Sequence, residues 1–157
     1  GVQTCALPIS AGDSHDGAVS TDKSLDDLLA NELVPFQQAV NNGASFVMVG
    51  HISAPAVTGD DTPASLSSVM VTDVLRNQLG FHGVVITDAM NMGAVTGTYS
   101  SADAAVTAIQ AGVDMILMPD DFQSAYQGVM DAVAGGTITE DRINESVARI
   151  IKVKLTM

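Results

Sequence analysis

Cysteine and basic residues are both scarce in this 157-residue sequence. Cys5 is the only cysteine, so no disulfide can form within the chain, and cysteine usage does not indicate a redox compartment. Six Lys and Arg residues stand against eighteen Asp and Glu residues, which gives a net charge of −12. Nucleic acids and anionic membranes are bound through basic surfaces, so this balance argues against both kinds of partner.

Long apolar runs and phosphate-binding glycine loops are missing as well. No run approaches the ~18 apolar residues of a membrane span. Gly93 and Gly97 lack both the following Lys-Ser/Thr and the GxGxxG form, so they do not indicate a nucleotide site. No signal peptide is visible, but the chain does not begin with Met. The sequence therefore leaves the compartment open between cytoplasm and secreted or cell-envelope.

Three short apolar runs predict the fold. A run that is apolar without alternation is typical of a strand buried on both faces, and such runs predict strands near residues 45–50, 83–87 and 114–118. Helical periodicity lies between and after them, so the pattern predicts an α/β fold with parallel strands and right-handed crossovers. A closed eight-stranded barrel needs roughly 250 residues, so the chain is either a small open-sheet domain or part of a barrel.

The helices and loops follow from periodicity and from turn residues. Ser24 is predicted to cap the start of a helical stretch. Pro35 lies within this stretch, so the pattern predicts either two short helices or one helix with a kink at Pro35. Further helices are predicted over 67–79, 102–111, 122–134 and 139–155, and loops over 10–21, 52–66 and 89–99.

Polar residues beside the predicted strands are the first candidates for chemistry. Parallel α/β proteins build their sites at the carboxyl ends of strands, where Asp88 and His51 lie. Asp88 is either a functional carboxylate or a turn residue at the strand exit. His51 either contacts a substrate or is a satisfied histidine at the rim. Asp114 precedes its strand and is predicted to be structural, and Asp120-Asp121 is predicted to cap a helix.

A second candidate is the Asp13-Ser14-His15 segment in a polar loop. Residues two apart in an extended loop point to the same side, so Asp13 can fix the His15 tautomer and raise its basicity. A surface loop without function is the more common outcome for such a motif. Metal binding by Asp13, His15, Asp16 and His51 is a rival use, but no His-x-x-x-His or Cys-rich spacing supports it, and no cofactor is expected.

Several segments together resemble glycoside hydrolase family 3, and within it the bacterial β-N-acetylglucosaminidases. The longest matching segment is 79–94 (LGFHGVVITDAMNMGA). The other matching segments are 13–15 (DSH), 32–36 (ELVPF), 48–52 (MVGHI), 63–67 (PASLS), 111–118 (AGVDMILM) and the 142–150 helix. Their order and spacing make a chance match improbable, and they cover most of the chain.

The resemblance implies a fold, an activity and residue roles. It implies the C-terminal half of a (β/α)8 TIM barrel over residues 10–157, and hydrolysis of terminal β-linked N-acetylglucosamine with retention. The substrate would be a carbohydrate, with peptidoglycan fragments expected. Asp88 matches the nucleophile of the family, His15 the general acid/base and Asp13 its partner; His51 is a weaker substrate-binding candidate. The two-residue dyad separates this subgroup from the β-glucosidases.

The sequence also departs from the family pattern. The first barrel strands, a sugar-binding Arg and a Lys-His pair precede this segment in the family and are absent here. Residues 1–9 resemble nothing in the family, which suggests a foreign segment and a truncated chain. Half a barrel leaves open strand edges, so the isolated chain is expected to be inactive. Two alternatives remain, another family 3 β-glucosidase or β-xylosidase, and a non-catalytic α/β binding module.

Overall fold

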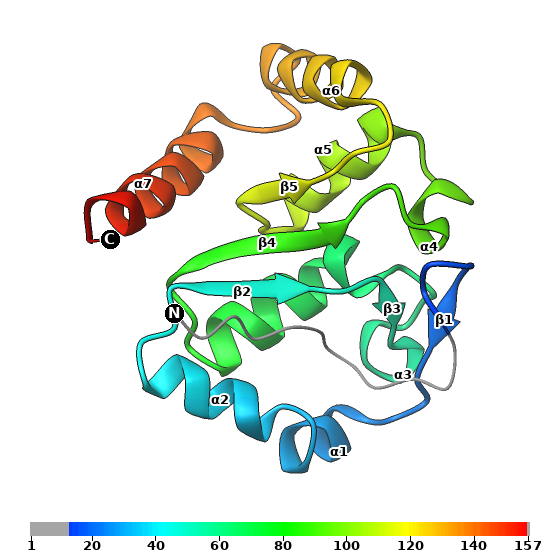
Figure 1. The fold of residues 1–157 in the computed structure, drawn as a ribbon, viewed down its shortest axis with the longest axis vertical. Helices are drawn as coiled ribbons and strands as arrows, with labels where there is room; N and C mark the ends of the chain where they lie inside the picture. Colours follow the sequence, from blue (N-terminus) through cyan, green and yellow to red (C-terminus); the bar gives the residue numbers. More distant parts are fainter. Residues whose placement is uncertain (1–12, 157) are drawn as a thin grey trace.

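A three-stranded parallel sheet forms the centre of the fold (Figure 1). The computed structural model describes residues 13–156, so the interpretation of residues 1–9 as a foreign segment lies outside the described residues. The sheet contains β2 (Phe46–Val49), β4 (Val84–Ala89) and β5 (Met115–Leu117), in the order β2-β4-β5 with β4 in the middle. The predicted α/β class and all three predicted strands are confirmed, and they form an open sheet.

Helices connect the strands and extend beyond the last one. The helical elements are α1 (Leu25–Ala30), α2 (Val34–Asn41), α3 (Pro55–Thr58), η1 (Ala64–Leu66), η2 (Val69–Gln78), α4 (Gly93–Thr96), α5 (Ser101–Ala111), α6 (Phe122–Ala134) and α7 (Glu140–Thr156). The break at Pro35 is confirmed, because α1 ends before it and α2 begins beside it. Ser24 and Asp121 cap α1 and α6 as predicted, each accepting a hydrogen bond from a backbone N–H in the first turn.

Two short strands and three short helices were not predicted. β1 (Val19–Ser20) and β3 (Ile52–Ser53) pair in parallel as a separate two-stranded sheet, inside segments predicted to be loops. Similarly, α3 and η1 lie within the predicted loop 52–66, and α4 lies within the predicted loop 89–99. Elements of two to four residues are too short to show a period in the sequence, so contacts made far along the chain determine them.

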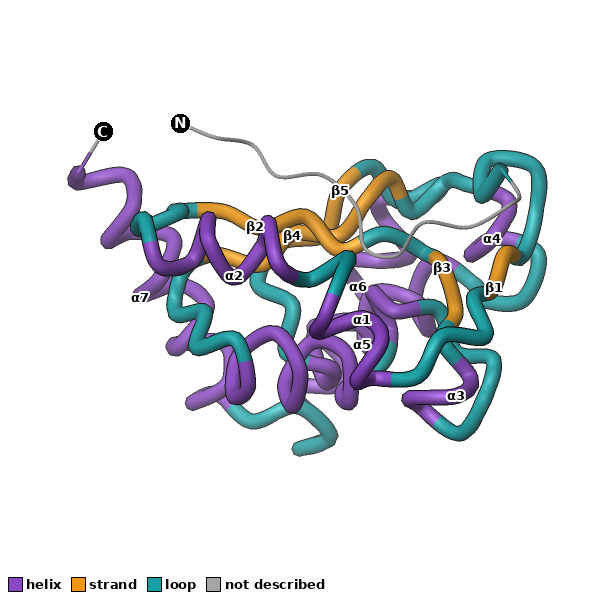
Figure 2. Tube along the Cα trace, turned by 90° about the horizontal axis from the view of Figure 1, so that it is seen from below, coloured by secondary structure: helices purple, strands orange, loops and turns teal. Residues whose placement is uncertain are grey.

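The two faces of the central sheet have different environments. Val47, Val49 and Val85 are almost fully buried, whereas Phe46, Met48 and Ile86, which alternate with them, are partly exposed. Figure 2 shows the helices gathered beneath and beside the sheet, which accounts for the buried face. No helix within residues 13–156 is long and apolar enough to cross a membrane.

Asp114 anchors the end of the sheet where the strands begin, and its predicted structural role is confirmed. Its side chain has no exposed surface. One carboxylate oxygen accepts hydrogen bonds from Arg76 at 2.7 Å and from the backbone N–H of Val85 at 2.9 Å. The other accepts from Ser146 at 2.6 Å and from Arg149 at 2.9 Å. This carboxylate therefore joins η2 and α7 to β4, at the end of the strand remote from Asp88.

Candidate active site

Asp88 lies one residue before the carboxyl end of β4, the central strand. Thr87 before it is fully buried, while Asp88 is partly exposed. Its Oδ1 accepts a hydrogen bond from the backbone N–H of Ala89 at 2.8 Å, which fixes the orientation of the carboxylate. A carboxylate held in this way on a paired strand is a rigid group at the edge where parallel sheets build their sites.

Asp13 and His15 form a hydrogen-bonded pair. Asp13 Oδ1 accepts from His15 Nδ1 at 2.7 Å and from the His15 backbone N–H at 2.9 Å. These hydrogen bonds lower the pKa of Asp13, and the carboxylate in turn raises the pKa of His15 above 6.5. A carboxylate can only accept, so Nδ1 carries a proton and Nε2 remains the nitrogen that can exchange one. Both side chains are exposed, at 64% and 74%.

The loop that carries the pair is bound to the segment after Asp88. The backbone N–H groups of Gly93 and Ala94 donate to the carbonyl oxygens of His15 (3.1 Å) and Ser14 (3.3 Å). α4 and β1 lie side by side in Figures 1 and 2, in agreement with this contact. The negative charge of Asp88 also contributes to the raised pKa of His15. The structure therefore binds the loop of Asp13 and His15 beside the segment that follows Asp88.

The close approach of the His15 loop requires a glycine at position 93, and this role of Gly93 was not predicted from the sequence. A Cβ atom at position 93 would lie 2.8 Å from the backbone oxygen of His15, closer than side chains approach backbone. The only signal in the sequence was a glycine shortly after the strand-end carboxylate, and its partner could not be read from the sequence.

His51 is buried, with 1% of its surface exposed, and both of its ring nitrogens are engaged. Nδ1 lies 2.7 Å from Ser65 Oγ, and Nε2 lies 3.0 Å from the carbonyl oxygen of Ala89. Burial lowers the pKa of His51 from 6.5, which favours the neutral ring. Because a carbonyl only accepts, the proton lies on Nε2, and the Ser65 hydroxyl donates to Nδ1.

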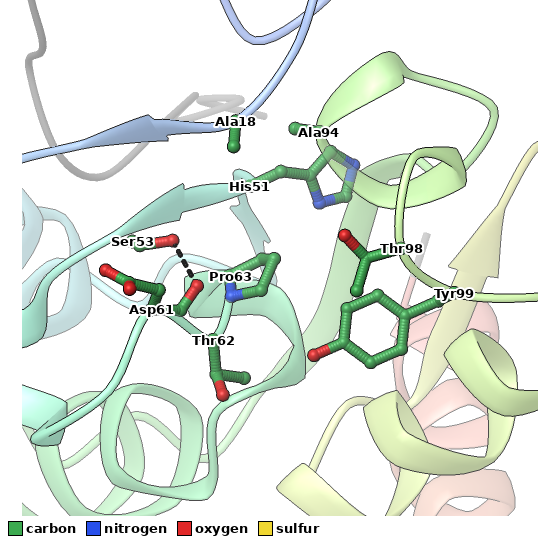
Figure 3. Close-up of a pocket in the computed structure, with 9 residues that line it drawn as sticks. All are labelled: Ala18, His51, Ser53, Asp61, Thr62, Pro63, Ala94, Thr98 and Tyr99. Atoms are coloured by element: carbon green, nitrogen blue, oxygen red, sulfur yellow. Dashed lines mark hydrogen bonds between the residues drawn. The ribbon is translucent and has the colours of Figure 1, made fainter.

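A cleft of about 330 Å³ adjoins His51 (Figure 3). Its lining includes Ser53, Pro63 and Tyr99, with the His51 ring at one end. The Ser53 hydroxyl donates to the Asp61 carbonyl at 2.7 Å, the dashed line in the figure. The lining does not include Asp13, His15 or Asp88. Across residues 13–156, no three His, Cys, Asp or Glu side chains are placed to hold a metal ion.

Comparisons with known proteins connect this arrangement to one group of enzymes. A β-N-acetylglucosaminidase of glycoside hydrolase family 3 from Paenibacillus sp. str. FPU-7 superimposes with a TM-score of 0.90 at 36% identity, covering 93% of this chain and 28% of that one. Beta-hexosaminidase LpqI of Mycobacterium tuberculosis is 33% identical over 92% of this chain and 38% of its own length. Beta-hexosaminidase A of Pseudoalteromonas piscicida is 28% identical over 90% of this chain and 27% of its own length.

The chain thus spans well under half the length of each of these curated relatives. The family profile described as "Glycosyl hydrolase family 3 N terminal domain" matches residues 8–153, which is nearly the whole chain. The chain therefore belongs to glycosyl hydrolase family 3 and corresponds to part of its N-terminal domain.

Proposed function

We propose that this chain is the part of a retaining exo-β-N-acetylglucosaminidase that carries the nucleophile Asp88 and the acid/base pair His15–Asp13. The observation that supports this most directly is the pair of backbone hydrogen bonds from Gly93 and Ala94 that binds the His15 loop beside the segment after Asp88. A nucleophile on a rigid strand opposite a proton-transfer group on a loop is the arrangement a two-step glycoside hydrolysis needs.

In the first step, Asp88 Oδ2 attacks the anomeric carbon of the terminal sugar while Ala89 N–H holds Oδ1. The bond to the leaving oxygen breaks, and protonated His15 gives its Nε2 proton to that oxygen. In the second step, neutral His15 accepts a proton through Nε2 from water, which attacks the same carbon and releases Asp88. Asp13 stays hydrogen-bonded to Nδ1 throughout and stabilises the imidazolium form.

The substrate class follows from the relatives. Proteins called β-hexosaminidase and β-N-acetylglucosaminidase recur among the matches, so a terminal β-linked N-acetylglucosamine is the proposed substrate, with peptidoglycan fragments as its natural source. The chain spans well under half the length of these relatives, so the activity is proposed for a protein of their full length.

Turnover of 4-nitrophenyl N-acetyl-β-glucosaminide by the complete gene product tests the proposal, with NMR of the first-formed sugar to identify retention. Asp88→Asn should abolish turnover, since an amide cannot form the covalent intermediate. His15→Ala should lower kcat by about 10²–10⁴-fold on substrates with a poor leaving group, because general acid catalysis contributes about that much. The loss should be smaller with 4-nitrophenol, which leaves without protonation. Asp120→Asn, an exposed carboxylate after β5, is the matched control. An active Asp88→Asn variant would overturn the assignment.

A second candidate is a family 3 β-glucosidase or β-xylosidase. A Cellulomonas fimi relative described as "Beta-N-acetylglucosaminidase/beta-glucosidase" is 29% identical over 79% of this chain, which keeps this alternative open. In that case the acid/base residue comes from elsewhere, so Asp88→Ala would remove activity and His15→Ala would not. A non-catalytic binding module would tolerate both changes.

A further inference from the structure

We infer that His51 is a positioning residue, which fixes the nucleophile Asp88 by holding the Ala89 peptide rather than by touching the substrate. The inference rests on the proposed function for its catalytic consequence, and on the contacts below for its structural content. Its donor atom is Nε2, and its acceptor is the carbonyl oxygen of Ala89, 3.0 Å away.

The backbone around Ala89 is held from both sides. His51 binds the Ala89 carbonyl, and the N–H of Met90, in the same peptide group, donates to the Leu117 carbonyl at 2.9 Å. That peptide therefore cannot rotate without losing two hydrogen bonds. The preceding peptide presents the Ala89 N–H to Asp88 Oδ1 at 2.8 Å. Fixing one peptide thus fixes the direction of the next and, with it, the carboxylate.

Ser65 completes this network by setting the state of the His51 ring. Its hydroxyl lies 2.7 Å from Nδ1, and Ser65 itself has no exposed surface. The Ser65 backbone N–H donates to the Gly50 carbonyl at 3.1 Å, which ties η1 to the end of β2. With Nδ1 accepting from Ser65, the proton is kept on Nε2, where the Ala89 carbonyl needs it.

A direct role in sugar binding does not fit this geometry. Both nitrogens are occupied by protein groups, and only 1% of the residue is exposed. A ligand would have to displace Ser65 or Ala89 to reach the ring, which would leave a buried polar atom without a partner.

Two amide substitutions separate the two hydrogen bonds. Gln is long enough to place an N–H₂ where Nε2 lies, so His51→Gln keeps the donor to Ala89. Asn reaches only the Nδ1 position, so His51→Asn keeps the contact with Ser65 and loses the one with Ala89. The two variants have the same charge and nearly the same polarity, so each is the control for the other.

In the complete gene product, we expect kcat of His51→Asn to fall by about 10- to 100-fold, since small misplacement of a reacting group costs up to about 10²-fold. KM should stay near the wild-type value, and His51→Gln should recover most of kcat. Equal losses in both variants, or a rise in KM without a fall in kcat, would overturn the inference. Thermal unfolding of both variants checks that a loss of fold does not produce the difference.

A measurement that needs no substrate separates this inference from the proposed function. Ala89–Met90 is the one Ala–Met step in these 157 residues, so labelling Ala with ¹³C at the carbonyl and Met with ¹⁵N isolates that peptide in an NMR spectrum. Its signal should shift in His51→Asn and stay close to wild type in His51→Gln. An unshifted signal in both variants would refute the contact, whereas an inactive wild-type enzyme with the expected shifts would refute only the proposed function.

Discussion

Replacement of Asp114 by Asn should unfold the chain more readily than any other single exchange of an acid for its amide. The carboxylate is fully buried and accepts four hydrogen bonds, two of them from the guanidinium groups of Arg76 and Arg149. The side chain of Arg142 lies 3.7 Å away and adds a third positive charge. Asn keeps the shape but removes the charge and turns an NH₂ group toward Arg76 or Arg149, whose guanidinium groups can only donate.

The magnitude follows from the uncompensated charge. Removing one partner of a buried ion pair costs about 3–5 kcal/mol, which is a large fraction of the roughly 5–15 kcal/mol that stabilises a typical domain. With a urea slope of about 2 kcal/mol/M, the unfolding midpoint should fall by roughly 2 M. Exposed Asp22→Asn is the control, with an expected change below about 0.5 kcal/mol.

Urea unfolding followed by circular dichroism is the assay, and a second substitution checks the cause. If unpaired positive charge produces the loss, Arg149→Met added to Asp114→Asn should recover part of the stability, because it removes one of the stranded charges. A midpoint for Asp114→Asn within about 0.5 M of wild type, equivalent to roughly 1 kcal/mol at that slope, would refute the reasoning.

Three further predictions concern the site. Gly93→Ala should displace the His15 loop and lower kcat without unfolding the protein. Gly17→Ala is the control, because a Cβ atom at position 17 meets no atom within 4 Å, and its kcat should stay at the wild-type value. Equal activities of the two variants would contradict the close contact at Gly93. Asp13→Asn removes the main cause of the raised His15 pKa, so the NMR titration of His15 and the alkaline limb of kcat/KM should both move toward lower pH, and an unmoved titration would disprove the coupling. Because burial lowers the pKa of His51, the unfolded chain binds this proton more readily, so the free energy of unfolding should fall as pH drops below 6.5. His15 contributes with the opposite sign, and comparison with His51→Gln isolates the His51 part; identical pH dependence in both proteins would be evidence against it.

The features of this fold that depend on residues close together in the sequence could be predicted from it. The three strands were predictable because each is an unbroken apolar run, and the break near Pro35 because its ring excludes a continuous helix. The Asp13–His15 hydrogen bond was predictable because the two residues are only two positions apart in the sequence. The position of Asp114 before a strand was enough to assign it a structural role.

The rest depends on contacts between distant residues. Three such contacts join segments that no local pattern connects. They are the pairing of β1 with β3, the hydrogen bond from Gly93 to the His15 loop, and the hydrogen bond from His51 to Ala89. His51 shows the limit most clearly. Its position after a strand suggested a rim residue, but only the burial of its ring and its two partners indicate how it could act.

The attachment of the His15 loop to Gly93 has a consequence for the order of events during folding. The two segments lie far apart in the chain, so the contact between them closes a long loop. Closing so long a loop costs entropy that earlier contacts must first repay, so this attachment belongs among the last steps. A molecule that has built its sheet but not closed this loop lacks the attachment of the Asp13–His15 segment beside α4, so the site proposed above would be the last part of the protein to assemble.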